Sequence, residues 1–209
     1  MRGMCLSILI ALMFCSFIDV HAQTNDLHWA TFGAGGPRFF AIKSDGTLWA
    51  SGTNYLGDGS EENRMIPLQV GTDSNWLSVL SGGIHTVALK KDSTLWTWGG
   101  NIYGQLGDGT MDIRSMPVQI GNDKWSSVSA GSFFTIGIKK DGTLWGWGQN
   151  FLGVLGNVID QTEIPVQIGT DKNWTKLSTG QEFCLALKSD STLWGWGANN
   201  DGELGDGTT

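Results

Sequence analysis

The sequence predicts an all-β fold made of tandem repeats, and three observations support this prediction. Tryptophan recurs at a regular spacing, because Trp29, Trp76, Trp125 and Trp174 follow one another after 47, 49 and 49 residues. Each repeat contains short runs of alternating apolar and polar residues, which are typical of β-strands. Glycine supplies 31 of the 209 residues, and no segment keeps a helical apolar period over three turns. The period therefore defines the fold.

Within each repeat, the residues predict four strands in a fixed order. The first strand runs from the opening tryptophan to a glycine six residues later (Gly35, Gly82, Gly131 and Gly180). The second strand alternates, with residues 85, 87 and 89 on one face and 86, 88 and 90 on the other, which predicts a half-buried strand. An Asp-Gly or Asp-Ser pair then predicts a tight hairpin into the third strand, whose pattern is Thr-Leu-Trp-x-Trp.

A polar, Gly-rich loop separates the third strand from a short fourth strand. The fourth strand is led by proline, as in 117–121, and a proline at this place removes no needed hydrogen bond. Four antiparallel strands in every 47 to 49 residues describe a propeller blade. We expect four four-stranded blades, at approximately 27–75, 76–124, 125–173 and 174–209, with the tryptophans packed between neighbours. The fourth repeat reaches Thr209 before a proline-led segment.

These repeats resemble those of the regulator of chromosome condensation family. The resemblance is carried by Gly82-Gly83-Ile84-His85-Thr86-Val87-Ala88-Leu89, Asp92, Leu95-Trp96-Thr97-Trp98-Gly99 and Asn101-x-Tyr103-Gly104-Gln105-Leu106-Gly107, and it covers 23–209. The first repeat departs from the pattern, because its loop after Asn54 lacks three residues. The resemblance implies a seven-bladed ring, which needs roughly 340 residues. We therefore expect residues 23–209 to be a partial propeller from a truncated reading of a longer protein.

The first 22 residues predict an export signal. Arg2 gives a positive start, residues 6–17 are apolar, and Val20-His21-Ala22 is a small-residue cleavage site. The mature chain would begin near Gln23 and keep only Cys184, so it could form no internal disulfide. We expect a protein of the periplasm, the medium or the surface of a bacterium, with no membrane span.

Charge and composition exclude several classes of partner and chemistry. A net charge of −7 leaves no basic surface, so nucleic acid is not an expected partner. His85 shares its repeat column with Arg38, Phe134 and Phe183, and Cys184 shares one with Phe39, Thr86 and Thr135, so both are interpreted as structural. The loops 101–110 and 199–208 carry oxygen ligands but not the spacing of a calcium loop. We expect no enzymatic activity, cofactor or metal.

The expected function is binding through loops on one face. Equivalent loops of successive blades emerge on the same side, which predicts an arc of anchor residues: Tyr55, Leu56, Ile102, Tyr103, Phe151 and Leu152. The other interpretation is that these side chains fold back and seal adjacent blades. The partner is expected to be a protein, with self-association if four repeats are the complete chain.

Two further functions are compatible with the resemblance. The first is inhibition of a secreted enzyme by loops from one face, as in a β-lactamase inhibitor with a similar propeller. The second is guanine-nucleotide exchange, the work of the family's founding member. Exchange fits less well, because an exported and acidic chain is separated from GTP and chromatin.

Overall fold

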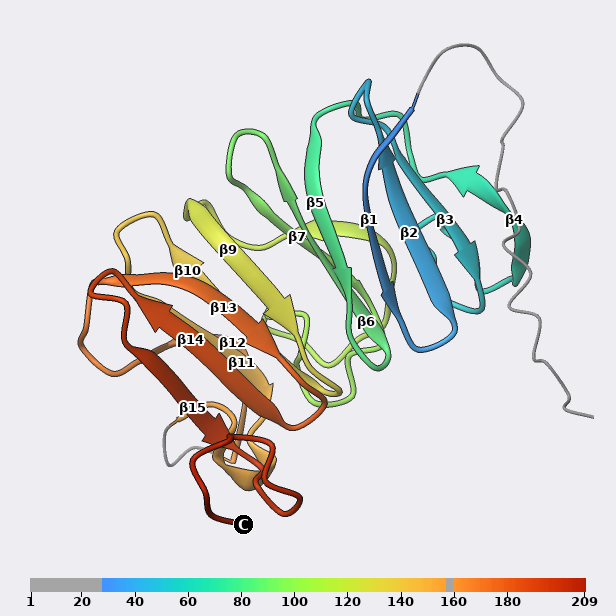
Figure 1. Ribbon diagram of the computed structural model, residues 1–209. Helices are drawn as coiled ribbons and strands as arrows, with labels where there is room; N and C mark the ends of the chain where they lie inside the picture. Colours follow the sequence, from blue (N-terminus) through green and yellow to red (C-terminus); the bar gives the residue numbers. More distant parts are fainter. Residues whose placement is uncertain (1–27, 157–159) are drawn as a thin grey trace, which may run out of the picture.

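The computed structural model describes residues 28–156 and 160–209. These residues form four antiparallel sheets that follow one another in chain order (Figure 1). The expected export signal, residues 1–22, lies outside the described residues. In the described ranges, no helix is long and apolar enough to cross a membrane.

Each sheet is a meander whose spatial order equals its chain order. The first holds β1 (Trp29–Gly35), β2 (Arg38–Lys43), β3 (Leu48–Gly52) and β4 (Arg64–Gln69). The second holds β5 (Trp76–Ser81), β6 (His85–Lys90), β7 (Leu95–Gly99) and β8 (Arg114–Gln119). The third holds β9 (Trp125–Ala130), β10 (Phe134–Lys139), β11 (Leu144–Gln149) and β12 (Gln161–Ile168), with the short 3-10 helix η1 (Phe151–Gly153) before β12. The fourth holds β13 (Trp174–Thr179), β14 (Phe183–Lys188) and β15 (Leu193–Gly197).

The predicted blades are confirmed, with one correction to the strand count. Every first strand starts at its opening tryptophan, and β1 ends at Gly35 as expected. The fourth sheet has three strands instead of four, because residues 198–209 form turns and loop. The other fourth strands were expected to begin at proline, but β4, β8 and β12 begin three or four residues earlier and contain Pro67, Pro117 and Pro165 in their interior. Proline is tolerated there because these are edge strands.

A further correction concerns the second strand of the inner blades. The alternation in 85–90 predicted a half-buried strand, but every residue of β6 is buried. The reason is that this blade has a neighbour on each side. One face of β6 lies over the first-blade core and the other over β9, so even the polar Thr86 is covered. Lys90 is covered by Trp76 and Trp96 of its own blade.

The hairpin between the second and third strands is held by an Asp-x-Thr-x-Trp relay. In the first blade, Asp45 Oδ1 accepts hydrogen bonds from the Thr47 amide at 2.9 Å and the Thr47 hydroxyl at 2.7 Å. Thr47 Oγ1 in turn accepts the indole N–H of Trp49 at 2.9 Å. The same relay recurs in the other three blades. The hairpin sequence therefore also orients the first tryptophan of each third strand.

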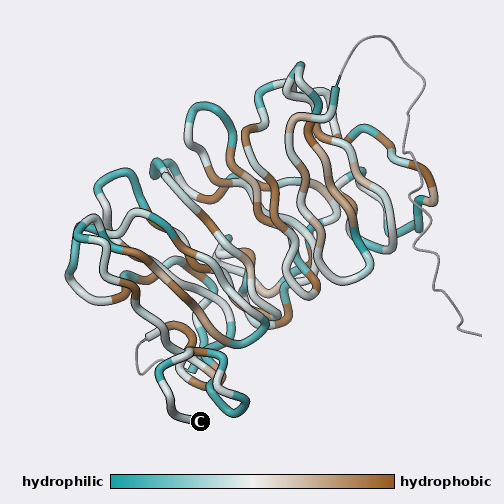
Figure 2. The backbone as a smooth tube through the Cα atoms, in the orientation of Figure 1, coloured by the Kyte–Doolittle hydropathy of each residue, from teal (hydrophilic) through white to brown (hydrophobic). Residues whose placement is uncertain are grey.

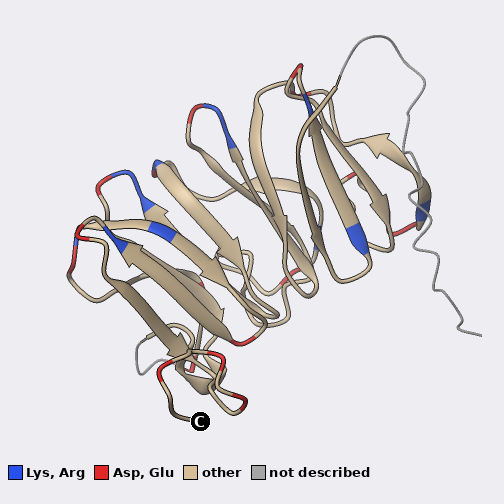
Figure 3. Cartoon of the chain, in the orientation of Figure 1, with Lys and Arg blue, Asp and Glu red and all other residues tan. Residues whose placement is uncertain are grey.

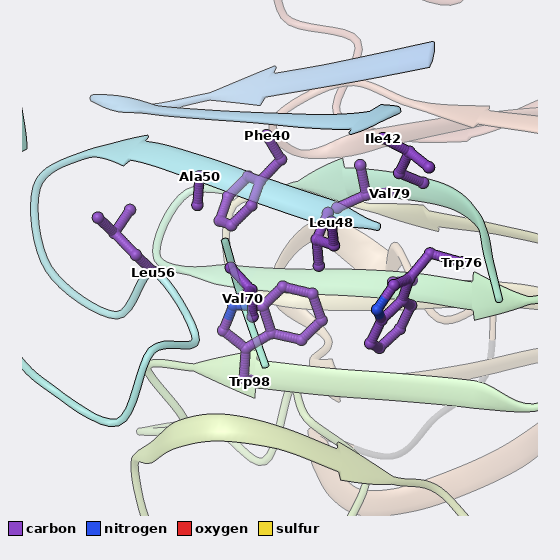
Figure 4. Packing of buried hydrophobic residues seen from close by; sticks show 10 residues of the cluster. Phe40, Ile42, Leu48, Ala50, Leu56, Val70, Trp76, Val79 and Trp98 are labelled. Carbon is purple, nitrogen blue, oxygen red and sulfur yellow. The ribbon is translucent and has the colours of Figure 1, made fainter. Parts of the chain in front are cut away.

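The cores lie between blades and not within them. The core of the first interface joins Phe40 and Leu56 of one blade to Trp76 and Trp98 of the next (Figure 4). The Trp98 ring packs edge-on against Phe40, with centroids 5.7 Å apart. Figure 2 shows the apolar segments along the strands and the hydrophilic ones at the turns. Two further clusters repeat this arrangement at the next two interfaces.

Sequence reasoning missed a lysine that caps the paired tryptophans of each blade. Lys139 Nζ lies 3.3 Å from the ring centroid of Trp145 and 5.4 Å from that of Trp125, and it also contacts Asp123 at 2.8 Å. Equivalent pairs of rings surround Lys43, Lys90 and Lys188. Cation–π contacts of this kind attract an ammonium group to the faces of the aromatic rings. These lysines recur after 47, 49 and 49 residues, which is the tryptophan period.

Candidate protein-binding face

The antiparallel meander places two kinds of connection at opposite ends of each sheet. We call one end the loop face, which carries the turns between first and second strands and the segments that follow the third strands (53–63, 100–113, 150–156 with 160, and 198–209). The other end, the turn face, carries the Asp-x-Thr hairpins and the connections between blades. Hydrogen bonds from Gly83 N to Gly131 O and from Ser132 N to Gln181 O join the loop-face turns of successive blades. The loop face is therefore continuous across the blades.

Internal hydrogen bonds fix the shape of the loop in the second blade. Asn101 is fully buried, its Nδ2 donates to Thr110 O at 2.8 Å, and its Oδ1 accepts the Leu106 amide at 2.9 Å. Thr97 donates its hydroxyl to Leu106 O at 2.9 Å. Asn150 accepts the Leu155 amide at 2.7 Å in the third blade. The loop-opening asparagine thus holds the loop closed, and Leu106 seals it against the core.

The expected anchor residues divide into exposed and buried ones. Ile102 is 54 % exposed, Phe151 58 % and Leu152 42 %, so these three present apolar surface on the loop face. Leu56 is fully buried, and its expected role as an anchor is corrected. The shortened first loop explains this difference, since Leu56 takes the place that Leu106 and Leu155 occupy in the longer loops and joins the core.

The remaining two anchors are half-buried tyrosines. Tyr103 packs edge-on against Phe133 of the next blade, with ring centroids 5.3 Å apart. This contact matches the interpretation in which a loop residue seals adjacent blades. Tyr55 is also half-buried and has φ of 54°, an unusual backbone conformation for a bulky side chain.

Backbone conformation also sets the position of Leu152. Its φ is 57° and its ψ is 22°, which places a branched apolar residue in the left-handed region. That region costs a residue with a Cβ atom roughly 1–2 kcal/mol. Strain of this kind gathers at functional sites when the surroundings hold it in place. Here the strained residue is also an exposed hydrophobic one.

All three described arginines of the loop face are used inside the protein. Arg38 is buried and donates through Nη2 to the carbonyls of Gly82 at 3.0 Å and Gly83 at 2.8 Å. Arg64 pairs with Asp58 at 2.8 Å, and Arg114 pairs with Asp108 at 2.7 Å. Burial would raise the pKa of Asp58, but hydrogen bonds from Arg64 and Ser60 bring it below its ordinary value.

The two candidate reactive side chains of the sequence lie in the core. His85 Nε2 is 2.8 Å from Thr135 Oγ1, and Thr135 donates its hydroxyl to Gln105 O at 2.8 Å, so the imidazole is the donor through Nε2. Burial, with a contribution from Arg38, lowers the pKa of His85 to about 3. Burial raises the pKa of the Cys184 thiol, whose Sγ lies 3.6 Å from Val154 O. Neither group reaches solvent.

A hollow of about 370 Å³ lies where the first-to-second-strand turns of the four blades meet. Glycines dominate its walls, together with Ser81, Ser132 and Thr179. Gly82 has no room for a side chain, because a Cβ atom there would meet His85 Cε1 at 2.7 Å. This hollow offers hydroxyl groups, backbone groups and the Gln181 amide, and none of its lining residues is an acid or a base.

The loops 101–110 and 199–208 are closed by their own hydrogen bonds. Asp108 Oδ1 accepts the amide of Thr110 at 3.0 Å and its hydroxyl at 2.8 Å, and Asp206 makes the same contacts with Thr208. Across 28–156 and 160–209, no three His, Cys, Asp or Glu side chains are grouped to hold a metal. These loops therefore have the geometry of Asp-stabilised turns.

Comparison with known sequences identifies the repeat. The profile described as regulator of chromosome condensation (RCC1) repeat matches residues 92–138 and 141–187. A second profile of the same repeat matches 125–153 and 174–203. No curated protein sequence matches the chain.

Solved structures share the architecture at low sequence identity. Prp20p from Saccharomyces cerevisiae, whose structure was described with its binding to Gsp1p and histones, has a TM-score of 0.77 and 19% identity, over 90% of this chain and 49% of Prp20p. Human WBSCR16 has a TM-score of 0.73 and 17% identity, over 82% of this chain and 48% of that one. The ectodomain of the Physcomitrella patens receptor kinase CR4 has a TM-score of 0.54 and 20% identity, over 84% of this chain and 42% of that one. The chain thus spans about half the length of the first two structures.

Proposed function

Because this chain belongs to the regulator of chromosome condensation repeat family, we propose that it is a non-enzymatic propeller that binds a protein through its loop face. The observation that carries this proposal is the exposure of Ile102, Phe151 and Leu152 on loops that are fixed by internal hydrogen bonds. Large apolar side chains on a rigid support lose little entropy when they bind, and such residues anchor interfaces. The fold alone would not support this proposal, since one fold hosts many functions.

The distribution of buried polar residues supports binding in preference to catalysis. His85 and Cys184 are enclosed, and the Asp58 and Asp108 carboxylates are committed to arginine. These groups stabilise the blades and have no access to a substrate. We also propose that the protein is exported by a bacterium with cleavage after Ala22, and that its blades belong to a seven-bladed ring. A mass measurement on the mature protein tests the cleavage, and a product that keeps Met1 would contradict it.

Binding through the loop face is tested with two matched double variants. Ile102→Ser with Phe151→Ser removes exposed apolar surface from the loop face. Ile66→Ser with Ile164→Ser removes similar surface from β4 and β12, where these residues are 77 % and 58 % exposed. We expect the first pair to abolish capture of a partner from the medium and the second to leave it intact, with the melting temperature nearly unchanged in both. Capture that survives the loop substitutions would refute this use of the face.

A further inference from the structure

Charged residues are sorted between the two ends of the sheets. All nine lysines of the described residues lie on the turn face or on the strand ends that adjoin it: Lys43, Lys90, Lys91, Lys124, Lys139, Lys140, Lys172, Lys176 and Lys188. Every described glutamate and arginine lies on the loop face or its adjoining strand ends. In Figure 3, where lysine and arginine share one colour, most of the basic positions lie toward the upper edge of the row of sheets.

The loop face is consequently strongly negative. Its eleven carboxylates are Asp58, Glu61, Glu62, Asp108, Asp112, Asp160, Glu163, Glu182, Asp201, Glu203 and Asp206. Against these stand the three arginines 38, 64 and 114, which gives a formal charge of −8 over the described residues. The turn face has nine lysines and seven aspartates, a formal charge of +2. The arginines are tied to carbonyls and to Asp58 and Asp108, so the exposed charge of the loop face is acidic.

Exposed apolar residues of this face gather on the two central blades, whereas exposed carboxylates are found on all four blades, with Asp112 in the second and Asp160 in the third. The loops of the second and third blades expose Ile102, Phe151 and Leu152, and the second also exposes Met111 and Ile113. The loop of the first blade exposes Glu61 and Glu62, and the loop-face segments of the fourth blade expose Glu182, Asp201 and Asp206. An apolar centre with charged flanks is the arrangement of protein interfaces, in which a water-excluded core is surrounded by a polar rim.

We infer that the loop face docks a basic protein, one whose own apolar patch is flanked by lysine or arginine. This inference rests on the proposed function, because it names the chemistry of the partner for the same surface. Charge complementarity selects this partner. A face with eight excess negative charges attracts a basic surface and repels an acidic one or a nucleic acid phosphate backbone.

The test uses a defined basic probe and two variants of equal net charge. The probe is cytochrome c, and its succinylated form provides the same fold with reversed charge. Glu61→Gln, Asp112→Asn and Glu182→Gln together remove three exposed charges from the loop face, and none of these carboxylates forms an ion pair or a hydrogen bond with the residues of 28–156 and 160–209. Ser44→Lys, Ser74→Lys and Ser189→Lys place three positive charges at exposed positions on the turn face.

We expect native cytochrome c to associate at low ionic strength and the succinylated form not to associate. The loop-face variant should slow association about tenfold, because local field steers the encounter. The turn-face variant, with the same net charge, should slow it by less than about threefold. Carbodiimide coupling of carboxylates to probe lysines should map to Glu61, Asp112 and Glu182. Equal slowing by both variants, or coupling chiefly to turn-face aspartates, would overturn the inference.

The natural partner separates this inference from the proposed function. If capture is lost in Ile102→Ser with Phe151→Ser but survives the loop charge variant and about 0.5 M salt, the loop face binds a protein that is not selected by basic charge. In that outcome the proposed function stands and the inference fails. If none of the loop substitutions affects capture, both fail.

Discussion

The indole of Trp147 lies against Gly107 of the preceding blade, where a Cβ atom would stand 2.6 Å from the indole nitrogen. Trp98 and Gly57 have the same relationship at the first interface, with a corresponding distance of 2.9 Å. The second tryptophan of the Trp-x-Trp-Gly pattern therefore packs on the backbone of the neighbour's loop. Glycine is required there because of this approach and also because of its positive φ, 76° at Gly107.

Gly107→Ala should lower the free energy of unfolding for two reasons, the positive φ at this position and the close approach of the indole. The left-handed backbone costs alanine about 1–2 kcal/mol, and overpacking against the indole adds about 1–3 kcal/mol. Gly121→Ala is the matched control, since Gly121 has φ of 55° and a Cβ atom there would meet nothing within 4 Å, so it bears only the backbone cost. Denaturant titrations of both variants, followed by tryptophan fluorescence, measure the difference. Equal losses would show that the indole yields to the added methyl group.

Tryptophans at different repeat positions should contribute unequally to stability. Trp147 is fully buried, and Trp147→Ala should cost about 3–5 kcal/mol, as for other large aromatic residues removed from a core. Trp194 is 51 % exposed, and Trp194→Ala should cost less than about half as much. Thermal melts of the two variants, read by circular dichroism, make the comparison. A similar loss in both would indicate that Trp194 is covered in solution.

The buried imidazole of His85 should make the protein sensitive to acid. Its pKa is about 3 in the folded state and 6.5 in the unfolded chain, so only the unfolded chain takes up this proton as pH falls below 6.5. Stability present above pH 6.5 is therefore lost toward pH 3, by about 1.4 kcal/mol for each pH unit.

His85→Phe should remove the part of the acid-induced loss of stability that comes from the imidazole. The part that comes from protonation of the carboxylates should remain. Phenylalanine fits the position, because Phe134 and Phe183 occupy the equivalent places over Gly131 and Gly180. The quantity to compare is the slope of unfolding free energy against pH between pH 6 and pH 4, measured in urea. Parallel slopes for the variant and the parent protein would mean that His85 is protonated in the folded state.

Replacing Lys139 should remove its contacts with the rings of Trp125 and Trp145. Its ammonium group lies over Trp145 and Trp125, and its side chain is only 13% exposed. Lys139→Met should cost about 1–2 kcal/mol, mostly from lost cation–π attraction. Lys124→Met is the control, since this side chain is 51% exposed and lies 3.9 Å from Asp92, and exposed ion pairs contribute at most about 1 kcal/mol. Unfolding of both variants in guanidinium should rank them in this order, and the reverse order would assign the stabilisation to surface charge.

Much of the fold could be predicted from the sequence because one period controls every strand. The opening tryptophans, and the glycines at or just after the ends of β1, β5 and β9, set the boundaries of the first strands without any long-range information. The fourth strands begin before the prolines that were expected to start them. Periodicity could not show how completely a strand is buried, and β6 is an example. Alternation reports the chemical difference between two faces, but a blade with neighbours on both sides buries both, and Lys90 is covered because paired tryptophans and Asp73 accept it.

The sequence predicted where the candidate face lies, but not which of its residues are exposed. The common position of the loops follows from the meander, and Ile102, Phe151 and Leu152 are exposed there. Leu56 was misplaced because counting from the loop-opening asparagine ignores the three missing residues, whereas counting back from the Asp-Gly pair would have aligned it with Leu106. The charge sorting has a signal in the sequence, since lysines stand beside the Asp hairpins and glutamates do not.

In the second and fourth loops, the opening asparagine and the leucine five residues later are required by the fold, whereas exposed residues between them are free to change. Asn101 and Leu106 bind the framework, and Asn199 and Leu204 repeat their hydrogen bond at 3.0 Å. Between these fixed points the second loop displays Ile102, and the fourth displays Asn200 and Asp201. The exposed intervening residues can therefore change during evolution, one blade at a time, and adapt the face to a new partner without changing the fold.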